Sequence, residues 1–143
     1  MGRRTNSTQR KFFVGKPTVV AADSPTEPFG CVFEDDGETG YFYAWDFHLK
    51  ENNIVDALHI YNVGSVIDRD LESVVEIVWL PDRLKALLRI NGYAHAVFDF
   101  SVKRGYCRNN YPNPPLEGDW ASPSHEWNES VLEGFPANGG NPA

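Results

Sequence analysis

The chain has 143 residues, 41% of them hydrophobic and 13% aromatic, which is enough to bury one substantial core without a metal or a disulfide. Its formal net charge of −7 disfavours nucleic acid as a partner, because affinity for phosphate backbones comes mainly from Lys and Arg. No apolar run approaches the ~18 residues of a membrane-spanning helix, and no signal peptide is recognisable. We therefore expect a cytoplasmic protein that binds neither nucleic acid nor membrane.

The two ends of the chain differ from its body. Residues 1–11 are polar and basic, and such a segment buries too little apolar surface to offset the entropy of ordering. Residues 135–143 combine Gly, Pro and Asn. Both segments are predicted to be flexible tails on a single domain over residues 12–134. From residue 17 onward the chain holds twenty acids and eight bases, so this domain is acidic.

The first half of the domain is predicted to form β-strands. Runs rich in β-branched and aromatic residues occupy positions 17–22, 30–35 and 40–46. The last two runs flank the turn-forming residues 36–39, so they are predicted to pair as an antiparallel hairpin. Because side chains alternate along a strand, the third run has two faces, one with Tyr41, Tyr43 and Trp45 and one with Phe42 and Ala44.

The second half adds further strand signals. Residues 56–63 and 72–80 are rich in β-branched residues. Residues 84–100 alternate in polarity around Asn91-Gly92, a dipeptide that suits the positive φ angles of a type I′ turn, so a second hairpin is predicted there. In the strand at 72–80 the predicted core face carries Val75, Ile77 and Trp79.

Residues 103–127 break this pattern. They contain four prolines and no strand or helix period, which predicts a long loop pinned to the sheet by aromatic side chains. A short helix is predicted after this loop, capped by Ser122 or Ser124. The predicted fold is mainly β, a single-domain curved antiparallel sheet or partly open barrel with one or two short helices.

The sequence indicates neither a metal site nor a cofactor. Cys31 and Cys107 lie far apart without CxxC or Cys/His spacing, so we expect reduced thiols and no zinc site. The acidic stretch around residues 34–38 lacks the alternating oxygen ligands of an EF-hand loop. The motifs GxSxG, GxGxxG and HExxH are absent, so no catalytic residue is assigned and an enzyme is the less favoured class.

One candidate site is formed by the acids Asp35, Asp36, Glu38 and Asp46. The structural interpretation is that this is a turn rich in Asp and Gly because those residues tolerate turns. The functional interpretation is a contact surface for a basic protein partner, because complementary charge speeds encounter and selects the right partner. A carboxylate pair used as general acid and base would instead need a dry cleft that separates the two pKa values.

A second candidate site combines His59, His95, Asp99 and Arg108 under the Pro-rich segment 103–127. His95 and Asp99 are four residues apart and share one face of a continuous strand. Ligand pockets combine apolar walls with a few converging polar groups of this kind. The structural alternative is that the histidines are hydrogen-bonded parts of the framework.

The strings VFEDDGETGYFYAWD, IVDALHIYNV, EIVWLPDRLKALLRINGYAHAVFDF and RGYCRNNYP together resemble an uncharacterised bacterial family, domain of unknown function 2251. The similarity runs from about Val19 to Trp120. It implies a small bacterial cytoplasmic domain with no established activity, so it transfers no catalytic residue. The residues that match the family pattern are Asp35, Asp36, Glu38, Tyr41, Tyr43, His59, Asp99, Phe100 and Arg108.

These observations favour a non-catalytic protein-binding module. In its most concrete form this is an immunity or antitoxin-like protein whose acidic face covers a basic toxin surface. The alternative is a small enzyme or ligand-binding domain with a site under residues 103–127. A structural subunit that associates with itself through a sheet edge is a third hypothesis.

Overall fold

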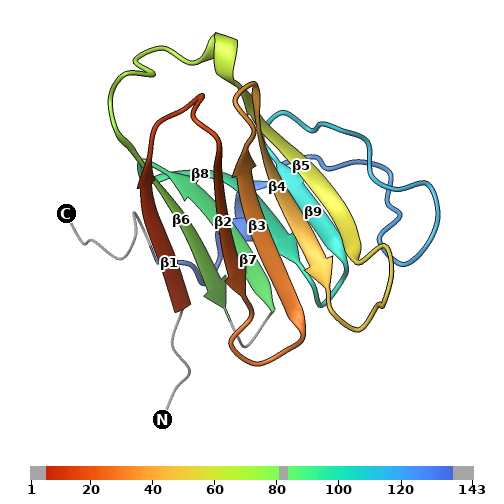
Figure 1. The fold of residues 1–143 in the computed structure, drawn as a ribbon. Coiled ribbons are helices and arrows are strands. Elements are labelled where there is room, and N and C mark those ends of the chain that lie inside the picture. Colours follow the sequence, from red (N-terminus) through yellow and green to blue (C-terminus); the bar gives the residue numbers. More distant parts are fainter. Residues whose placement is uncertain (1–5, 81–83, 137–143) are drawn as a thin grey trace.

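The computed structural model describes residues 6–80 and 84–136. Its strands form two antiparallel sheets that pack face to face (Figure 1). Sheet A has the order β1-β6-β7-β8-β9, and sheet B has the order β2-β3-β4-β5. The prediction of a mainly β, antiparallel fold is confirmed, with the difference that the strands divide between two sheets and close no barrel.

The strands of sheet A are β1 (Asn6–Phe12), β6 (Ser73–Leu80), β7 (Lys85–Ile90), β8 (Tyr93–Asp99) and β9 (Arg104–Cys107). The strands of sheet B are β2 (Thr18–Asp23), β3 (Phe29–Asp35), β4 (Thr39–Asp46) and β5 (Ile54–Asn62). Two 3₁₀-helices complete the described elements, η1 (Val63–Ser65) and η2 (Glu129–Leu132). Within the described ranges, no helix has the length and apolar character needed to cross a membrane.

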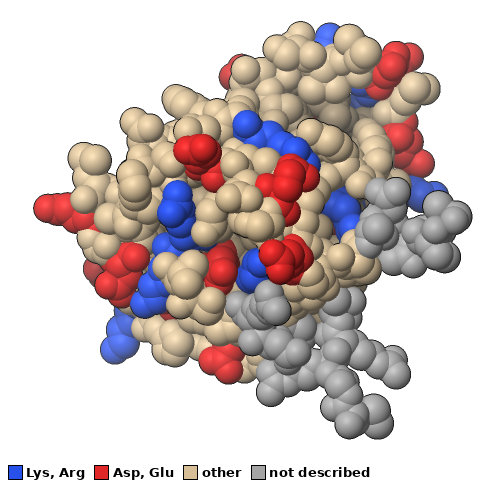
Figure 2. All heavy atoms as spheres, turned by 180° about the vertical axis from the view of Figure 1, so that it is seen from behind, with Lys and Arg blue, Asp and Glu red and all other residues tan. Residues whose placement is uncertain are grey.

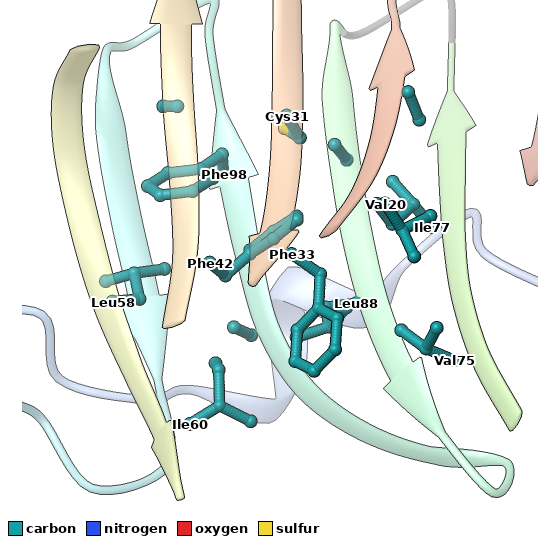
Figure 3. Packing of buried hydrophobic residues seen from close by; sticks show 14 of the residues in the cluster. Val20, Cys31, Phe33, Phe42, Leu58, Ile60, Val75, Ile77, Leu88 and Phe98 are labelled. Atoms are coloured by element: carbon teal, nitrogen blue, oxygen red, sulfur yellow. The ribbon is translucent and has the colours of Figure 1, made fainter. Parts of the chain in front are cut away.

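The core lies between the two sheets. Figure 3 shows Phe33, Phe42 and Leu58 of sheet B pointing toward side chains of sheet A. The rings of Phe42 and Phe98 stack across the sandwich with centroids 5.0 Å apart. The predicted core face of β6 is confirmed, because its side chains are fully buried in this cluster; they are Val75, Ile77 and Trp79.

Both predicted hairpins form, and their turns have the expected chemistry. Asn91 and Gly92 have φ angles of 52° and 81°, which are the positive values that a type I′ turn requires. At the other hairpin the Asp36 carboxylate accepts hydrogen bonds from the backbone N–H groups of Glu38 and Thr39, each at 2.9 Å. These two bonds lower the pKa of Asp36. Local polar groups therefore set the β3–β4 turn.

The prediction of a flexible tail is wrong for residues 6–11, which belong to β1. This strand pairs with β6 along its whole length, with Gln9 opposite Glu76. Ser7 Oγ and Gln9 Nε2 donate hydrogen bonds to the Glu76 carboxylate at 2.6 and 3.1 Å. The segment is ordered by backbone pairing and by a buried acceptor, which its lack of apolar side chains did not indicate. Residues 1–5 lie outside the described residues.

The outer face of sheet A is also buried, because the end of the chain covers it. A second apolar cluster joins Val78, Leu87 and Val97 of the sheet to Val131 of η2, with Trp127, Leu132 and Phe135 packed against it. We call residues 127–136 the C-terminal cover. The predicted tail is wrong for 135–136, since Phe135 packs here and the Pro136 carbonyl accepts a hydrogen bond from Arg89 Nη1.

The remaining predictions near the C-terminus are partly corrected. Strand β9 lies in the segment predicted to be loop, and it pairs with β8. The predicted short helix is a single 3₁₀ turn, and its cap is Asn128, whose side chain accepts from Ser130 N–H. Ser122 and Ser124 do not cap it. Residues 137–143 lie outside the described residues.

Candidate functional site

The outer face of sheet B is left bare by the described chain (Figure 1). Alternation along the strands places one set of side chains on this face. We call this set the sheet B face, and it consists of Val32, Glu34, Tyr41, Tyr43, Trp45 and His59. Each of these residues is half-buried. Val19 at the edge is 54% exposed.

Aromatic rings dominate the middle of the sheet B face. Tyr41 and Tyr43 stack with centroids 5.8 Å apart and an interplanar angle of 13°. The Tyr43 hydroxyl donates to Glu34 Oε1 at 3.3 Å. Burial, followed by the nearby charge of Glu34, raises the pKa of Tyr43 to about 12, so the phenol keeps its proton at neutral pH. This surface is rigid, apolar in its middle and supplied with hydrogen-bonding hydroxyls.

The acidity of the protein is concentrated in the half that forms sheet B. Residues 16–62 hold nine Asp and Glu and two Lys, and nine less two gives a net −7, equal to the formal net charge of the whole chain. Two of these acids, Asp35 and Asp56, are buried. Figure 2 shows the opposite side of the molecule, where basic and acidic side chains are interspersed. The negative field is therefore stronger on the side of sheet B.

Asp35 must be removed from the predicted partner-contact residues. Its side chain is 1% exposed. Its Oδ2 accepts from Gly15 N–H at 2.8 Å and from the Tyr61 hydroxyl at 2.6 Å, and its Oδ1 accepts from Gly37 N–H at 2.8 Å. Burial and the hydrogen bond to Asp35 raise the pKa of Tyr61. Asp35 therefore ties the β3–β4 hairpin to neighbouring elements and does not face a partner.

Gly40 makes this arrangement sterically accessible. The ladder pairs Asp35 with Gly40, and Gly40 with Tyr61, so all three lie side by side on one face. A Cβ atom on Gly40 would lie 2.7 Å from the Tyr61 ring. Only glycine leaves room for the Tyr61 ring to lie over this position and reach the Asp35 carboxylate. Alternation with the buried residues Cys31 and Phe33 is the sequence signal that places Asp35 on the inner face.

The other three predicted acids lie at two ends of the molecule. Asp36 and Glu38 are exposed in the β3–β4 turn. Asp46 ends β4 at the opposite end, where its Oδ1 accepts from His48 N–H at 2.9 Å and lies 3.0 Å from His48 Nδ1. The structure therefore does not bring the four predicted acids into one patch. They flank the aromatic sheet B face instead.

Three members of the predicted ligand site lie near the start of the Pro-rich segment. Arg108 N–H donates to the His95 carbonyl at 3.3 Å. Burial, followed by the charge of Arg108, lowers the pKa of His95 to about 4. His59 Nδ1 lies 2.6 Å from Asn109 Nδ2. Asp99 ends β8 away from His95 and accepts from Ser101 N–H at 3.0 Å, so it does not join the other three.

The structure shows a buried Asp–His pair that the sequence did not indicate. His125 Nε2 lies 2.9 Å from Asp56 Oδ2, and His125 Nδ1 faces the Pro112 carbonyl. Both ring nitrogens therefore face oxygen atoms, which hold the imidazole in one orientation. A Cβ atom on Gly105 would lie 2.9 Å from Asp56 Oδ2, so glycine at this position leaves room for the carboxylate. The alternation of Asp56 with Leu58 and Ile60 could have placed it inside.

This buried pair is structural rather than catalytic. His125 is fully enclosed and both of its nitrogens are occupied. The nearby Cys107 thiol contacts Asn109 Oδ1 and the Tyr111 carbonyl, and burial raises its pKa. A nucleophilic cysteine needs the opposite shift and a base that can take its proton. The pair instead pins the Pro-rich segment to β5. Both cysteines are free, as expected.

A second buried pair lies beneath the C-terminal cover. Arg89 Nε donates to Glu76 Oε1 at 3.0 Å. Burial raises the pKa of Glu76, but hydrogen bonds from Ser7 and Gln9 and the charge of Arg89 outweigh this effect and leave the pKa lowered. Among residues 6–80 and 84–136, no group of three or more His, Cys, Asp or Glu side chains is placed to hold a metal.

The fold and the sheet B face together define a small antiparallel β-sandwich protein with one covered and one bare outer face. Residues 12–136 match a family described as uncharacterized protein conserved in bacteria, DUF2251. The chain belongs to this family, which confirms the resemblance found in the sequence.

A relative in Haemophilus influenzae (strain ATCC 51907 / DSM 11121 / KW20 / Rd), named as an uncharacterized protein, is 48% identical over 111 residues. That match covers 77% of this chain and 69% of the relative. No solved structure matches the chain. Neither the family description nor the relative's name assigns an activity.

Proposed function

We propose that this protein is a non-catalytic binding module whose sheet B face docks a basic protein partner in the bacterial cytoplasm. The observation that carries the proposal is the contrast between the two outer faces. The chain covers the outer face of sheet A with its own residues 127–136. The outer face of sheet B is not crossed by another described segment in Figure 1. It carries the stacked rings of Tyr41 and Tyr43.

The residue types of the sheet B face suit a protein interface. Tyrosine and tryptophan are enriched among the residues that dominate binding energy, because they bury a large area with few rotatable bonds. Tyr41, Tyr43 and Trp45 supply such groups from one strand. Their half-buried rings are already held by neighbouring side chains, so little conformational entropy is lost when a partner covers them.

The charge distribution supports a basic partner. The acids that flank the aromatic middle, including Glu34, Asp36 and Glu38, form a negative rim on the half that carries net −7. A basic partner surface would be steered toward this rim, whereas an acidic one would be repelled. Asp36 and Glu38 are solvent-exposed, so we expect this rim to affect the association rate more than the final affinity.

An immunity or antitoxin-like role is the narrower form of this proposal. A small protein that covers a basic toxin surface needs a rigid framework and complementary charge, and the stacked tyrosines and nearby acids of the sheet B half support this role. Co-expression of a captured basic partner with and without this chain tests that form. We expect the partner alone to arrest growth. The wild-type chain should relieve this arrest, and sheet B face variants should not.

The binding proposal itself is tested by quantitative capture from the native host. The wild-type chain is compared with Tyr41→Ser/Tyr43→Ser and with the control Val102→Ser/Leu116→Ser, which removes exposed apolar side chains elsewhere. The double tyrosine variant should weaken binding of a basic protein by about 30-fold or more, the effect of losing one hot spot of ~2 kcal/mol. Circular dichroism checks that each variant folds.

Two further results sharpen this test. Association should slow as salt rises from 50 to 300 mM, because the exposed rim charges are then screened. A captured partner that is acidic, or one whose binding is lost in the control but kept in the tyrosine variant, would show that the binding surface lies elsewhere.

A further inference from the structure

A cavity of about 400 Å³ lies at one end of the sandwich, apart from the sheet B face. Its walls come from three connections and the strands beside them, namely the β1–β2 loop, the β5–β6 connection at 63–72 and the β7–β8 turn. Val14, Val66 and Ile90 give it an apolar interior. Pockets that bind small molecules have this size and this largely apolar lining.

The β5–β6 connection leaves apolar side chains in water beside the cavity. Ile67 is 83% exposed and Leu71 is 61% exposed, and both line the cavity. Single exposed aliphatic residues are common on protein surfaces. Here two of them border one hollow, so a bound molecule with an apolar body would remove both from water at once.

The charged groups that line the cavity are all acidic. Asp68 and Glu72 contribute carboxylates from the same connection, and the lining includes no Lys or Arg. Asn91 and Ser73 also line it, but they are engaged with each other through a 3.2 Å hydrogen bond. The carboxylates therefore set the charge that a ligand must match.

His95 adds an uncharged polar group to the cavity lining. Its pKa is lowered to about 4 by burial and then by the charge of Arg108, so its ring is neutral at pH 7. A cationic group is thus favoured near Asp68 and Glu72, while an apolar body is favoured against the cavity walls.

From this geometry we infer that the end cavity binds a small organic cation, an ammonium group carried on an aliphatic or aromatic body. The ammonium lies between the carboxylates of Asp68 and Glu72, and the body packs against Val14, Val66 and Ile90. An anion of the same shape is repelled by both carboxylates, and a neutral isostere lacks the charge-assisted hydrogen bonds. This site is independent of the partner surface on sheet B.

The inference is tested with 2-phenylethylammonium as the probe, titrated into the full chain and followed by calorimetry and by amide NMR shifts. The neutral 2-phenylethanol serves as its isostere, and phenylacetate serves as an anion of similar size. We expect the ammonium to bind at least about 10-fold tighter than the alcohol, as one charge-assisted hydrogen bond of ~1.5 kcal/mol provides. The anion should not bind measurably. Shifts should be centred on residues 66–73 and 90–95.

Two variants and one control locate the site. Asp68→Asn/Glu72→Gln should abolish the preference for the ammonium over the alcohol, and Val66→Phe should weaken both by filling the cavity. Asp70→Asn removes a charge from the same connection but not from the cavity lining, so it should bind like the wild type. Equal affinity for the ammonium and the anion would overturn the inference. So would wild-type affinity in the double amide variant, or no saturation by the ammonium at 10 mM.

Discussion

The two outer faces of this sandwich begin from the same strand geometry and end in different environments. On sheet A the outward side chains Val78, Leu87 and Val97 are buried beneath the C-terminal cover. On sheet B the outward side chains include Tyr41, Tyr43 and Trp45 and are half-buried. No described segment crosses the middle of this face in Figure 1, while His59 on β5 meets Asn109 of the Pro-rich segment. The comparison shows that apolar outward residues alone do not tell which face a chain will cover itself.

The polar groups on the two faces differ in the same way. Beneath the cover, Glu76 receives hydrogen bonds from Ser7, Gln9 and Arg89, because an unpaired buried carboxylate would be strongly destabilising. On the bare face Glu34 receives one hydrogen bond, from Tyr43, and water can supply the rest. A carboxylate on a covered face thus needs all of its hydrogen bonds from the protein. A carboxylate on a bare face can still accept hydrogen bonds from another molecule.

The cover is itself held by a cation between two rings. The Arg108 guanidinium carbon lies 4.2 Å from the centroid of Trp127 and 4.7 Å from that of Tyr93. Its Nη1 donates to Glu129 at 2.8 Å. Arg108, predicted from sequence as a ligand-binding residue, therefore links β8 to the C-terminal cover. These contacts do not test the ligand hypothesis for His59, His95 and Arg108, which stays a prediction.

The largest expected effect comes from breaking the buried pair that anchors the segment leading to the cover. His125→Ala leaves the Asp56 carboxylate buried without its partner, so we expect a loss of about 3–5 kcal/mol of unfolding free energy. Urea denaturation measures it. Glu126→Gln, an exposed neighbour, should change stability by less than about 0.5 kcal/mol. A loss below about 1 kcal/mol in His125→Ala would mean that the segment is not anchored there.

A matched pair of substitutions compares the two faces directly. Val97→Asn places an unpaired amide beneath the cover and should destabilise by about 3 kcal/mol, from lost apolar burial and an unsatisfied polar group. Val32→Asn makes the same change on the bare face, where water can pair with the amide, and should lower stability by less than about 1 kcal/mol. Thermal unfolding of both variants measures the difference. Equal losses would show that the sheet B face is covered in solution.

The lowered pKa of His95 should make the stability of the protein depend on pH. Its pKa is about 4 in the folded protein against an ordinary value of 6.5, so the unfolded chain binds more protons between these values. Stability is therefore full above pH 6.5 and declines as pH falls toward 4. From pH 7 to pH 5 we expect a loss of about 1–2 kcal/mol from this group. His95→Gln should flatten the profile by that amount; an unchanged profile would contradict the shift.

The smallest expected effects lie on the bare side. Glu38→Gln and Val19→Thr alter exposed positions with no side-chain contact that the fold depends on, so each should change stability by less than about 0.5 kcal/mol. Chemical denaturation of the two variants measures this. The contrast is with partner binding, which Glu38→Gln should slow. A loss above about 1 kcal/mol would place these residues in a structural contact.

Much of the fold was predictable from local patterns. The strands at 30–35 and 40–46 and the Asn91-Gly92 hairpin follow from alternation and turn chemistry, which depend on neighbouring residues only. The edge strand β1 was missed because its order comes from pairing with residues about seventy positions away. Strand β9 was missed because it has four residues, too short to show a period.

The candidate site was also predictable only where it depends on neighbouring residues. The sequence showed that the acids and tyrosines around the β3–β4 hairpin are concentrated in one stretch, and alternation placed Tyr41, Tyr43 and Trp45 together. It did not show which groups bind Asp35, since the donors Gly15 N–H and the Tyr61 hydroxyl come within reach of its carboxylate only when the strands are paired. It also gave no signal for the meeting of Asp56 with His125, which are 69 residues apart.

The sequence by itself determined the antiparallel strands, the turn types and the acidity of the half that forms sheet B, because these properties arise within single elements or short hairpins. Only the tertiary structure decided which outer face is covered, which carboxylates are buried and where a cavity remains. Those outcomes depend on contacts between residues distant in sequence, such as Asp35 with Gly15 and Tyr61, and Val131 with the outer face of sheet A.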